Sequence, residues 1–282
     1  MAIELATKYL PYVDEIFKAE SKKSLLTNDD FDWTGAHTVK VYKIGTSSMT
    51  DYDRAGTGSG ATGSRYGTIE NLSATTQTMV IAKDRSFTFV IDKLDTDETG
   101  RTLEAASALA RQLREVVVPE VDAYVYGKMC TGAGTKPAAV TLTADNIYSE
   151  IVKGTTILDD AEVNESGRVL LVVPEVYQLM KRSSEVVLNT NVGEDMRLKG
   201  VISNLDGMNV IKVPSGRVPE NFGFMIAHPV ATVAPTKLAD YKTHQDPPGI
   251  SGALIEGRIV YDAFILDNKK MAIYYQENKP SE

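Results

Sequence analysis

The chain of 282 residues has a single cysteine, Cys130, and no excess of positive charge. One thiol cannot form an internal disulfide or a multi-thiolate metal site, so we expect a protein built in a reducing compartment. The 30 lysines and arginines are outnumbered by 38 aspartates and glutamates, which gives a formal net charge of −8. Because tight nucleic-acid binding needs a surplus of basic residues to neutralise phosphates, this balance argues against such binding as the main task.

Long apolar runs are also missing. No stretch approaches the roughly 20 apolar residues that a membrane helix requires. The N-terminus carries Glu4 where a signal peptide would have basic residues followed by an apolar core. We therefore expect neither membrane insertion nor export by a signal peptide. Hydrophobic residues nevertheless make up 43% of the chain, which excludes a disordered protein.

The sequence contains no credible catalytic constellation. The three histidines are far apart and lack the spacing of a zinc site, so we expect neither a metal nor a cofactor. One short segment matches the G-x-G-x-x-G pattern through Gly58, Gly60 and Gly63. The dinucleotide fingerprint needs a strand before the glycines and a helix after them, and polar residues flank them here. We interpret the segment as a loop tip and keep a nucleotide-binding α/β enzyme as a remote alternative.

The first half of the chain combines strand patterns with a long polar loop. Residues 37–44 alternate in polarity and predict a strand, and residues 1–33 read as a polar arm with one short amphipathic helix. Of the 25 residues from 45 to 69, 15 are Gly, Ser or Thr. The segment is far longer than the usual connection of ~4–6 residues. Two β-rich runs, 75–82 and 85–94, lie only two residues apart and predict a hairpin.

A helical pattern then runs from 97 to 130, and Pro119 within it should kink or divide the helix. Residues 131–235 read as a separate α/β unit with helices at 145–160 and 174–182, strands at 168–173 and 207–213, an apolar run at 224–233 and an exposed polar loop at 183–200. Residues 257–266 and 271–276 predict a final hairpin.

Four segments, taken in order, resemble the major capsid protein of tailed bacteriophages, which has the Hong Kong ninety-seven type capsid fold. They are YGTIENLSATTQTMVIAKDRSFTFVIDKLD (Tyr66–Asp95), VVVPEVDAYVY (Val116–Tyr126), the helix and strand of Thr143–Met180, and RLKGVISNLDGMNVIKVP (Arg197–Pro214). The resemblance implies an α+β chain. It would have an N-terminal arm (1–33), an elongated peripheral (P) domain (34–130) with an extended β-loop (45–73) and a long spine helix (97–130), an α/β axial (A) domain (131–235), and a return of the P domain with a C-terminal tail (236–282).

The same resemblance implies a structural protein without enzymatic activity. It would assemble with copies of itself, as pentamers and hexamers, into the icosahedral head shell of a virion, built in the host cytoplasm around double-stranded DNA without sequence-specific binding. The implied partners are a portal protein at one vertex, decoration proteins in some members and a separate scaffolding protein, because Met1 leads directly into the arm. An encapsulin-like bacterial compartment shell, with the same fold and an enzyme cargo, is the alternative.

The resemblance also implies which residues serve assembly. Some members cross-link covalently through a loop lysine, but residues 44–82 contain no lysine, so this chain would lack the nucleophile. The spine-helix kink would lie at Pro119. The extended loop would contribute Arg54, Gly56, Gly58, Gly60, Gly63, Arg65 and Tyr66, and the axial loop at the capsomer centre Glu185, Glu194, Asp195 and Arg197.

Overall fold

The computed structural model describes residues 21–28, 30, 33, 38–56, 64–98, 105–183 and 204–280. The chain divides into two units, Gly35–Val80 and a larger one formed by Met1–Thr34 and Ile81–Glu282. We call the first the hairpin unit. It contains the two antiparallel strands β1 (Thr38–Ile44) and β2 (Ala74–Val80), with Thr38 opposite Val80 and Ile44 opposite Ala74. The strand predicted at 37–44 is thereby confirmed.

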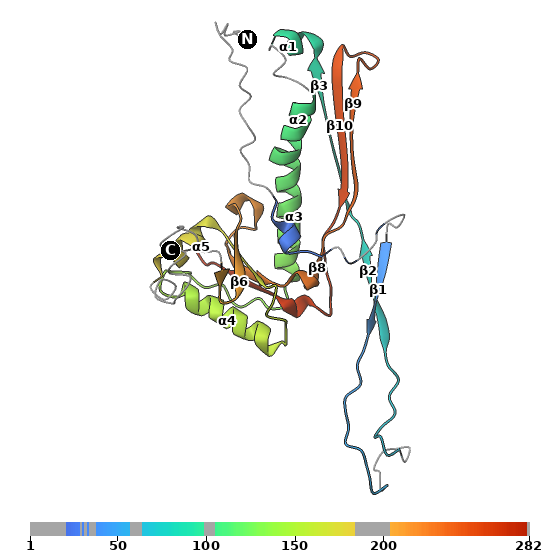
Figure 1. Ribbon diagram of the computed structural model, residues 1–282, viewed down its shortest axis with the longest axis vertical. Coiled ribbons are helices and arrows are strands. Elements are labelled where there is room, and N and C mark those ends of the chain that lie inside the picture. Colours follow the sequence, from blue (N-terminus) through green and yellow to red (C-terminus); the bar gives the residue numbers. More distant parts are fainter. Residues whose placement is uncertain are drawn as a thin grey trace. The chain divides into compact units, whose positions relative to one another are not determined.

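The larger unit begins with a three-stranded antiparallel sheet. Its order is β3 (Lys83–Asp92), β10 (Gly252–Tyr261) and β9 (Thr236–Gln245) (Figure 1). The predicted hairpin of 75–82 with 85–94 is therefore wrong, because β2 pairs with β1 whereas β3 pairs with a strand that lies about 170 residues further along the chain. The two-residue gap between the runs marks a change of partner instead of a turn.

Helices run along this sheet in Figure 1. They are α1 (Lys93–Glu98), α2 (Ala105–Gln112), a π-helical turn (Leu113–Val117) and α3 (Val118–Gly132). The predicted helix at 97–130 corresponds to α2, the π-helical turn and α3. The start of that range falls in α1 and in residues outside the described part. The helix α3 buries apolar groups, among them Val121, Val125 and Met129.

A second sheet of five strands forms the core of the rest. Its order is β12 (Ile273–Glu277), β7 (Phe222–Ala227), β4 (Val169–Val172), β6 (Met208–Lys212) and β5 (Asn204–Leu205), and β4 and β6 run parallel. The helix α4 (Ile147–Asp160) packs closely on it at Gly154, where a Cβ would lie 2.9 Å from side-chain atoms of Ile226 and Tyr274. The helix α5 (Pro174–Arg182) follows β4. These strands and helices confirm the elements predicted at 145–160, 168–173, 174–182 and 207–213.

The last part of the chain corrects the other predicted hairpin. β11 (Phe264–Ile265) pairs with β8 (Thr232–Val233), and β12 pairs with β7, so 257–266 and 271–276 do not pair with each other. The segment 236–282 thus contributes strands to both large sheets. Short 3-10 helices complete the described chain at Lys23–Leu25, Ser215–Arg217, Pro229–Ala231 and Lys270–Ala272.

Candidate assembly surfaces

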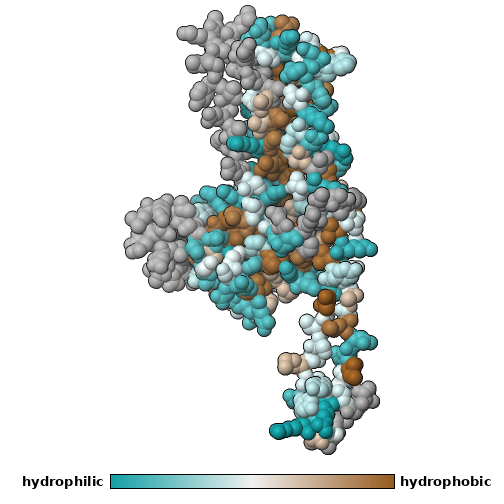
Figure 2. Space-filling model, turned by 45° about the vertical axis from the view of Figure 1, so that its right-hand side comes forward, coloured by the Kyte–Doolittle hydropathy of each residue, from teal (hydrophilic) through white to brown (hydrophobic). Residues whose placement is uncertain are grey.

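The hairpin unit exposes most of its large apolar side chains. Among the described residues, thirteen such side chains stand exposed and eight belong to this unit: Tyr42, Ile44, Met49, Tyr52, Tyr66, Ile69, Leu72 and Val80. The alternation of β1 and β2 puts Tyr42, Ile44 and Val80 on one face of the ribbon. Apolar groups gather on its surface in Figure 2. Soluble proteins rarely leave such patches uncovered, so this face has the character of an interface.

The tip of the hairpin unit is built by hydrogen bonds between its two chain segments. The Thr50 hydroxyl donates to the Tyr66 carbonyl over 2.9 Å, and the Asp53 amide donates to the Arg65 carbonyl over 2.9 Å. The Gly56 amide donates to Asp53 Oδ1, and Gly56 has a φ of +73°, a conformation that favours glycine. The described residues 50–56 and 65–66 are thus held together by their own hydrogen bonds.

This tip presents two tyrosines and two arginines to solvent. The rings of Tyr52 and Tyr66 meet edge to face with centroids 5.0 Å apart, and Arg54 and Arg65 are exposed. Of the loop residues named from the sequence, the structure brings together Gly56, Arg65 and Tyr66. Arg54 is exposed in the same loop, and the other three, Gly58, Gly60 and Gly63, lie outside the described residues.

The buried carboxylate of Asp262 binds the chain at Ala82, two residues after the hairpin unit ends. Asp262 accepts hydrogen bonds of 2.8 Å from the Ala82 amide, the Tyr124 hydroxyl and the Ala263 amide. On the other side of the hairpin unit, Trp33 stacks on Phe264 with ring centroids 5.4 Å apart. Residues 33 and 82, which belong to the larger unit and flank the hairpin unit in the sequence, are therefore both held at residues 262–264. Sequence reasoning missed this site, because a lone aspartate at a strand end gives no signal by itself.

A second buried cluster joins three parts of the larger unit. Asp122 in α3, only 1% exposed, accepts from Ser21 Oγ over 2.6 Å and from Arg217 Nη1 over 2.9 Å. Burial raises the pKa of Asp122 above its usual value, although the Ser21 hydroxyl and the positive charges of Arg217 and Lys23 act against that rise. The cluster ties Ser21, α3 and the Ser215–Arg217 turn together.

Pro119 lies in the first turn of α3, directly after the π-helical turn. A proline lacks an amide hydrogen and clashes with the carbonyl four residues before it in a regular α-helix. The wider π-helical turn leaves room at this point, and π-turns are often found where a helix has to adjust. The flanking residues Val117 and Val118 keep ordinary helical dihedrals. The role of Pro119 as a kink in assembly stays a prediction.

The four axial-loop residues Glu185, Glu194, Asp195 and Arg197 lie outside the described residues. The described chain stops at Ser183, after α5. Within that helix, the Tyr177 ring contacts two ammonium groups, those of Lys181 and Lys212, each 5.1 Å from the ring centroid. Such cation–π contacts favour a fixed position of the tyrosine.

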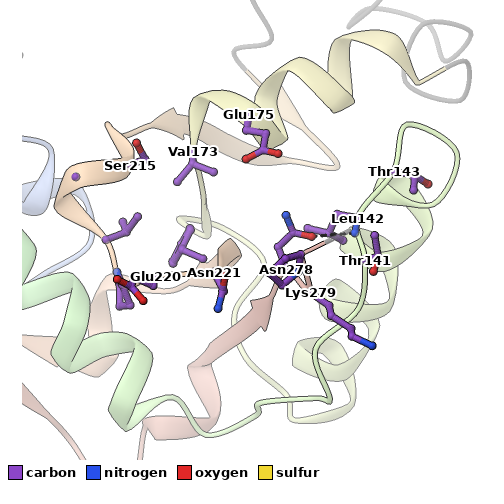
Figure 3. Close-up of a pocket in the computed structure, with 15 residues that line it drawn as sticks. Thr141, Leu142, Thr143, Val173, Glu175, Ser215, Glu220, Asn221, Asn278 and Lys279 are labelled. Atoms are coloured by element: carbon purple, nitrogen blue, oxygen red, sulfur yellow. Dashed lines mark hydrogen bonds between the residues drawn. The ribbon is translucent and has the colours of Figure 1, made fainter. Parts of the chain in front are cut away.

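An open hollow of about 780 Å³ lies at the end of the five-stranded sheet (Figure 3). Its walls come from residues 141–143, the start of α5, residues 215–222 and the tail at 278–280. The Leu142 amide donates to Asn278 Oδ1 over 3.0 Å and fixes the tail there. The described lining offers hydroxyl groups and the carboxylates of Glu175 and Glu220 but no histidine.

The glycine pattern does not have the context of a nucleotide site. The described residues 45–56 before it and 64–73 after it contain neither strand nor helix, whereas the dinucleotide fingerprint needs both. Within the described chain, no three His, Cys, Asp or Glu side chains cluster as metal ligands would. A search of the same residues finds no helix with the length and apolarity that a membrane span needs.

Comparison with known proteins shows which solved structures share this architecture. No family model and no curated protein matches the sequence. Solved structures match over nearly the whole chain. The Mycobacterium phage Che8 structure has a TM-score of 0.75 at 17% identity and covers 98% of both chains. The capsid of cyanophage P-SCSP1u has a TM-score of 0.76 at 14% identity and covers 99% of this chain and 94% of that one.

A virus-like particle from Pyrococcus furiosus is more distant, with a TM-score of 0.57 at 13% identity and coverage of 91% and 92%. In these three structures the likeness in fold extends over 91–99% of this chain. The protein has the fold of phage capsid subunits, as the resemblance in its sequence implied.

Proposed function

We propose that this chain is the structural major capsid protein of a tailed phage and assembles with copies of itself into a closed head shell. The observation that carries the proposal is the hairpin unit, which holds eight of the thirteen large apolar side chains that are exposed in the described part of the chain. A two-stranded ribbon is at best marginally stable in water and gains stability when its apolar face is covered. A neighbouring subunit in a shell supplies that cover. The full-length likeness to capsid structures supports this reading.

In the proposed shell, the subunits form pentamers and hexamers around double-stranded DNA. Residues 1–33 act as the N-terminal arm, 45–73 as the extended loop, 34–130 with 236–282 as the P domain, and 131–235 as the A domain. The net charge of −8 suits a container, because its inner wall must not trap the genome. A separate scaffolding protein, a portal protein and decoration proteins are the proposed partners, with assembly in the host cytoplasm and no enzymatic activity.

A bacterial compartment shell is the second candidate, and the likeness to the virus-like particle favours keeping it. The two candidates differ in their contents. Purified particles that hold double-stranded DNA support the phage capsid, and particles that hold one enzyme as cargo support the compartment.

Replacement of 45–69 by a short Gly-Ser link tests the role of the hairpin unit. We expect a soluble chain that keeps its helical circular-dichroism signal, because the core helices and sheets belong to the larger unit. The same chain should no longer form shells. Loss of the folded state instead would contradict the proposal, since the loop would then serve the core of its own subunit.

A single-residue version keeps the chain length constant. Ile44→Ser removes an exposed apolar group from the ribbon face, whereas Met271→Ser removes one from the larger unit. We expect the first change to lower the yield of shells and the second to leave it near that of the unmodified chain. Equal yields would argue against the ribbon as the interface.

A further inference from the structure

A small cavity lies between the helices and the three-stranded sheet of the larger unit. Its volume is about 140 Å³. The described residues that line it belong to β3, β10, the end of α2, the π-helical turn and the start of α3. In another protein, an apolar cavity of roughly 150 Å³ stays free of water and binds benzene. This cavity therefore has the size of one aromatic ring.

The walls of the cavity are apolar. Val121 and Tyr261 are only 6% and 2% exposed. The Phe87 ring lies over Gly257, where a Cβ would be 2.3 Å from a ring atom, and it stacks on Phe89 with centroids 6.2 Å apart. These contacts hold the Phe87 ring in place as one wall. The apolar side chains of the described lining are Phe87, Val116, Val117, Val121, Ile259 and Tyr261.

The space is left open by a wide helical turn and by short side chains. Val116 and Val117 belong to the π-helical turn, whose i→i+5 hydrogen bonds make it wider than an α-helix. Valine ends at its Cγ atoms, so the valines at 116, 117 and 121 leave a gap between the helices and the two strands. Turns of this kind are frequent at functional sites, which accords with a binding role here.

An ion pair lies at the mouth of the cavity. Arg85 Nε donates to Glu120 Oε1 over 2.7 Å, and the Tyr261 hydroxyl donates to the same oxygen over 3.4 Å. The side chains of Arg85 and Glu120 are 59% and 42% exposed, so the pair is in contact with water. No hydrogen bond between described residues ends on Glu120 Oε2. That oxygen can accept a hydrogen bond from a ligand whose ring occupies the cavity.

We propose that this cavity binds a neutral molecule with one aromatic ring and one hydrogen-bond donor. The ring lies between α3 and the sheet, and the donor bonds to Glu120 Oε2. Phenol is the simplest molecule of this class. Every described residue of the site belongs to the larger unit of one subunit. The site therefore needs no neighbouring copy, and its test does not depend on whether the chain forms shells.

Titration of unassembled subunits of the full chain with phenol tests the proposal. A ligand that binds only the folded state raises the melting temperature as its concentration rises. We expect such a rise with phenol, together with slower amide hydrogen exchange in residues 112–121, which include the helical part of the lining. A melting temperature and an exchange pattern that phenol leaves unchanged would overturn the proposal.

Two variants fill the cavity and locate the ligand. Val121→Ile adds a methyl group from a buried position, and Val116→Phe adds a ring from a position that is 46% exposed and accommodates a larger side chain. Both should abolish the effects of phenol. Val125→Ile is the matched control, because Val125 is 0% exposed in the same helix but does not belong to the described lining, and this variant should still bind phenol. Folded Val116→Phe subunits that bind phenol as the unmodified chain does would overturn the proposal.

A second ligand tests the role of Glu120. Toluene has the ring and the size of phenol but no hydrogen-bond donor. Glu120→Met keeps the length of the side chain and removes the acceptor, so the ratio of phenol affinity to toluene affinity should fall about tenfold, the contribution of one hydrogen bond to a charged group. Glu115→Met removes a carboxylate from the same helical stretch outside the described lining and should leave the ratio unchanged. Calorimetric titration measures both affinities, and an equal ratio in Glu120→Met and the unmodified chain would contradict the assigned acceptor.

Discussion

Arg217→Met tests the buried ion pair that joins α3, through Asp122, to the Ser215–Arg217 turn. Methionine keeps much of the length and apolar stem of arginine but has no positive charge. Arg217 is buried and donates to Asp122, which is 1% exposed and also accepts from Ser21. Removal of the cation leaves the buried carboxylate with the Ser21 hydroxyl and the charge of Lys23.

The expected loss is about 3–5 kcal/mol, the cost of breaking a buried ion pair from one side. For a chain of this size each kcal/mol lowers the melting temperature by about 2 °C, so we expect a fall of roughly 6–10 °C near neutral pH. The loss should depend on pH. The folded pKa of Asp122 already lies above its usual value, so this group favours folding in acid and loses that contribution as pH rises through the folded pKa. Without Arg217 the pKa rises further, and the variant should be penalised more at pH 7 than at pH 4.

Calorimetry of unassembled subunits at both pH values measures the effect. Arg85→Met is the matched control, because Arg85 pairs with Glu120 over 2.7 Å on the exposed surface, where such pairs contribute little. A melting temperature within 1 °C of the unmodified chain would refute the reasoning. So would an Arg217→Met loss that is equally large at pH 4 and pH 7.

Further predictions concern single positions and the finished particle. Asp262→Asn should destabilise the subunit by about 1–3 kcal/mol, because the new side-chain NH2 group must point toward a donor such as the Ala82 backbone N–H. Urea unfolding measures this loss, and an unchanged midpoint would contradict it. Gly257→Val should cost about 1–3 kcal/mol in the same assay, because a Cβ there would lie 2.3 Å from the Phe87 ring. Pro119→Ala should keep or raise the melting temperature of free subunits yet make closed particles fewer or less uniform in size, and particles of normal yield and diameter would show that the proline is incidental. Particles boiled in SDS should run as one band near the monomer mass of 30.7 kDa, whereas a ladder that survives reductant would disprove the absence of covalent cross-links.

Local patterns predicted the elements of the larger unit well. The apolar run at 168–173 and the proline that opens 174–182 gave β4 and α5, because the strand is buried on both faces and proline suits a first helical turn. The helical period at 145–160 likewise gave α4. These features depend on neighbours within a few residues.

Strand pairing could not be read in the same way. The runs that became β2 and β3 looked like a hairpin, but β3 pairs with β10, and Ser86 faces Arg258 across a gap in sequence of more than 170 residues. Alternation in polarity identifies a strand and its faces but not its partner. The clusters at Asp262 and Asp122 escaped detection for the same reason, since their donors Ala82 and Arg217 come from distant segments. The described residues 45–56 and 64–69 contain neither strand nor helix, as the composition of 45–69 predicted, because so many Gly, Ser and Thr residues exclude a packed core.

Electron microscopy of the purified full-length chain, expressed alone and with its scaffolding protein, tests the central claim most directly. We predict closed, uniform icosahedral particles in at least one of the two preparations. Their capsomers should have five and six subunits, and replacement of 45–69 should abolish them. A protein that stays monomeric under both conditions, at concentrations where other capsid subunits assemble, would contradict the account.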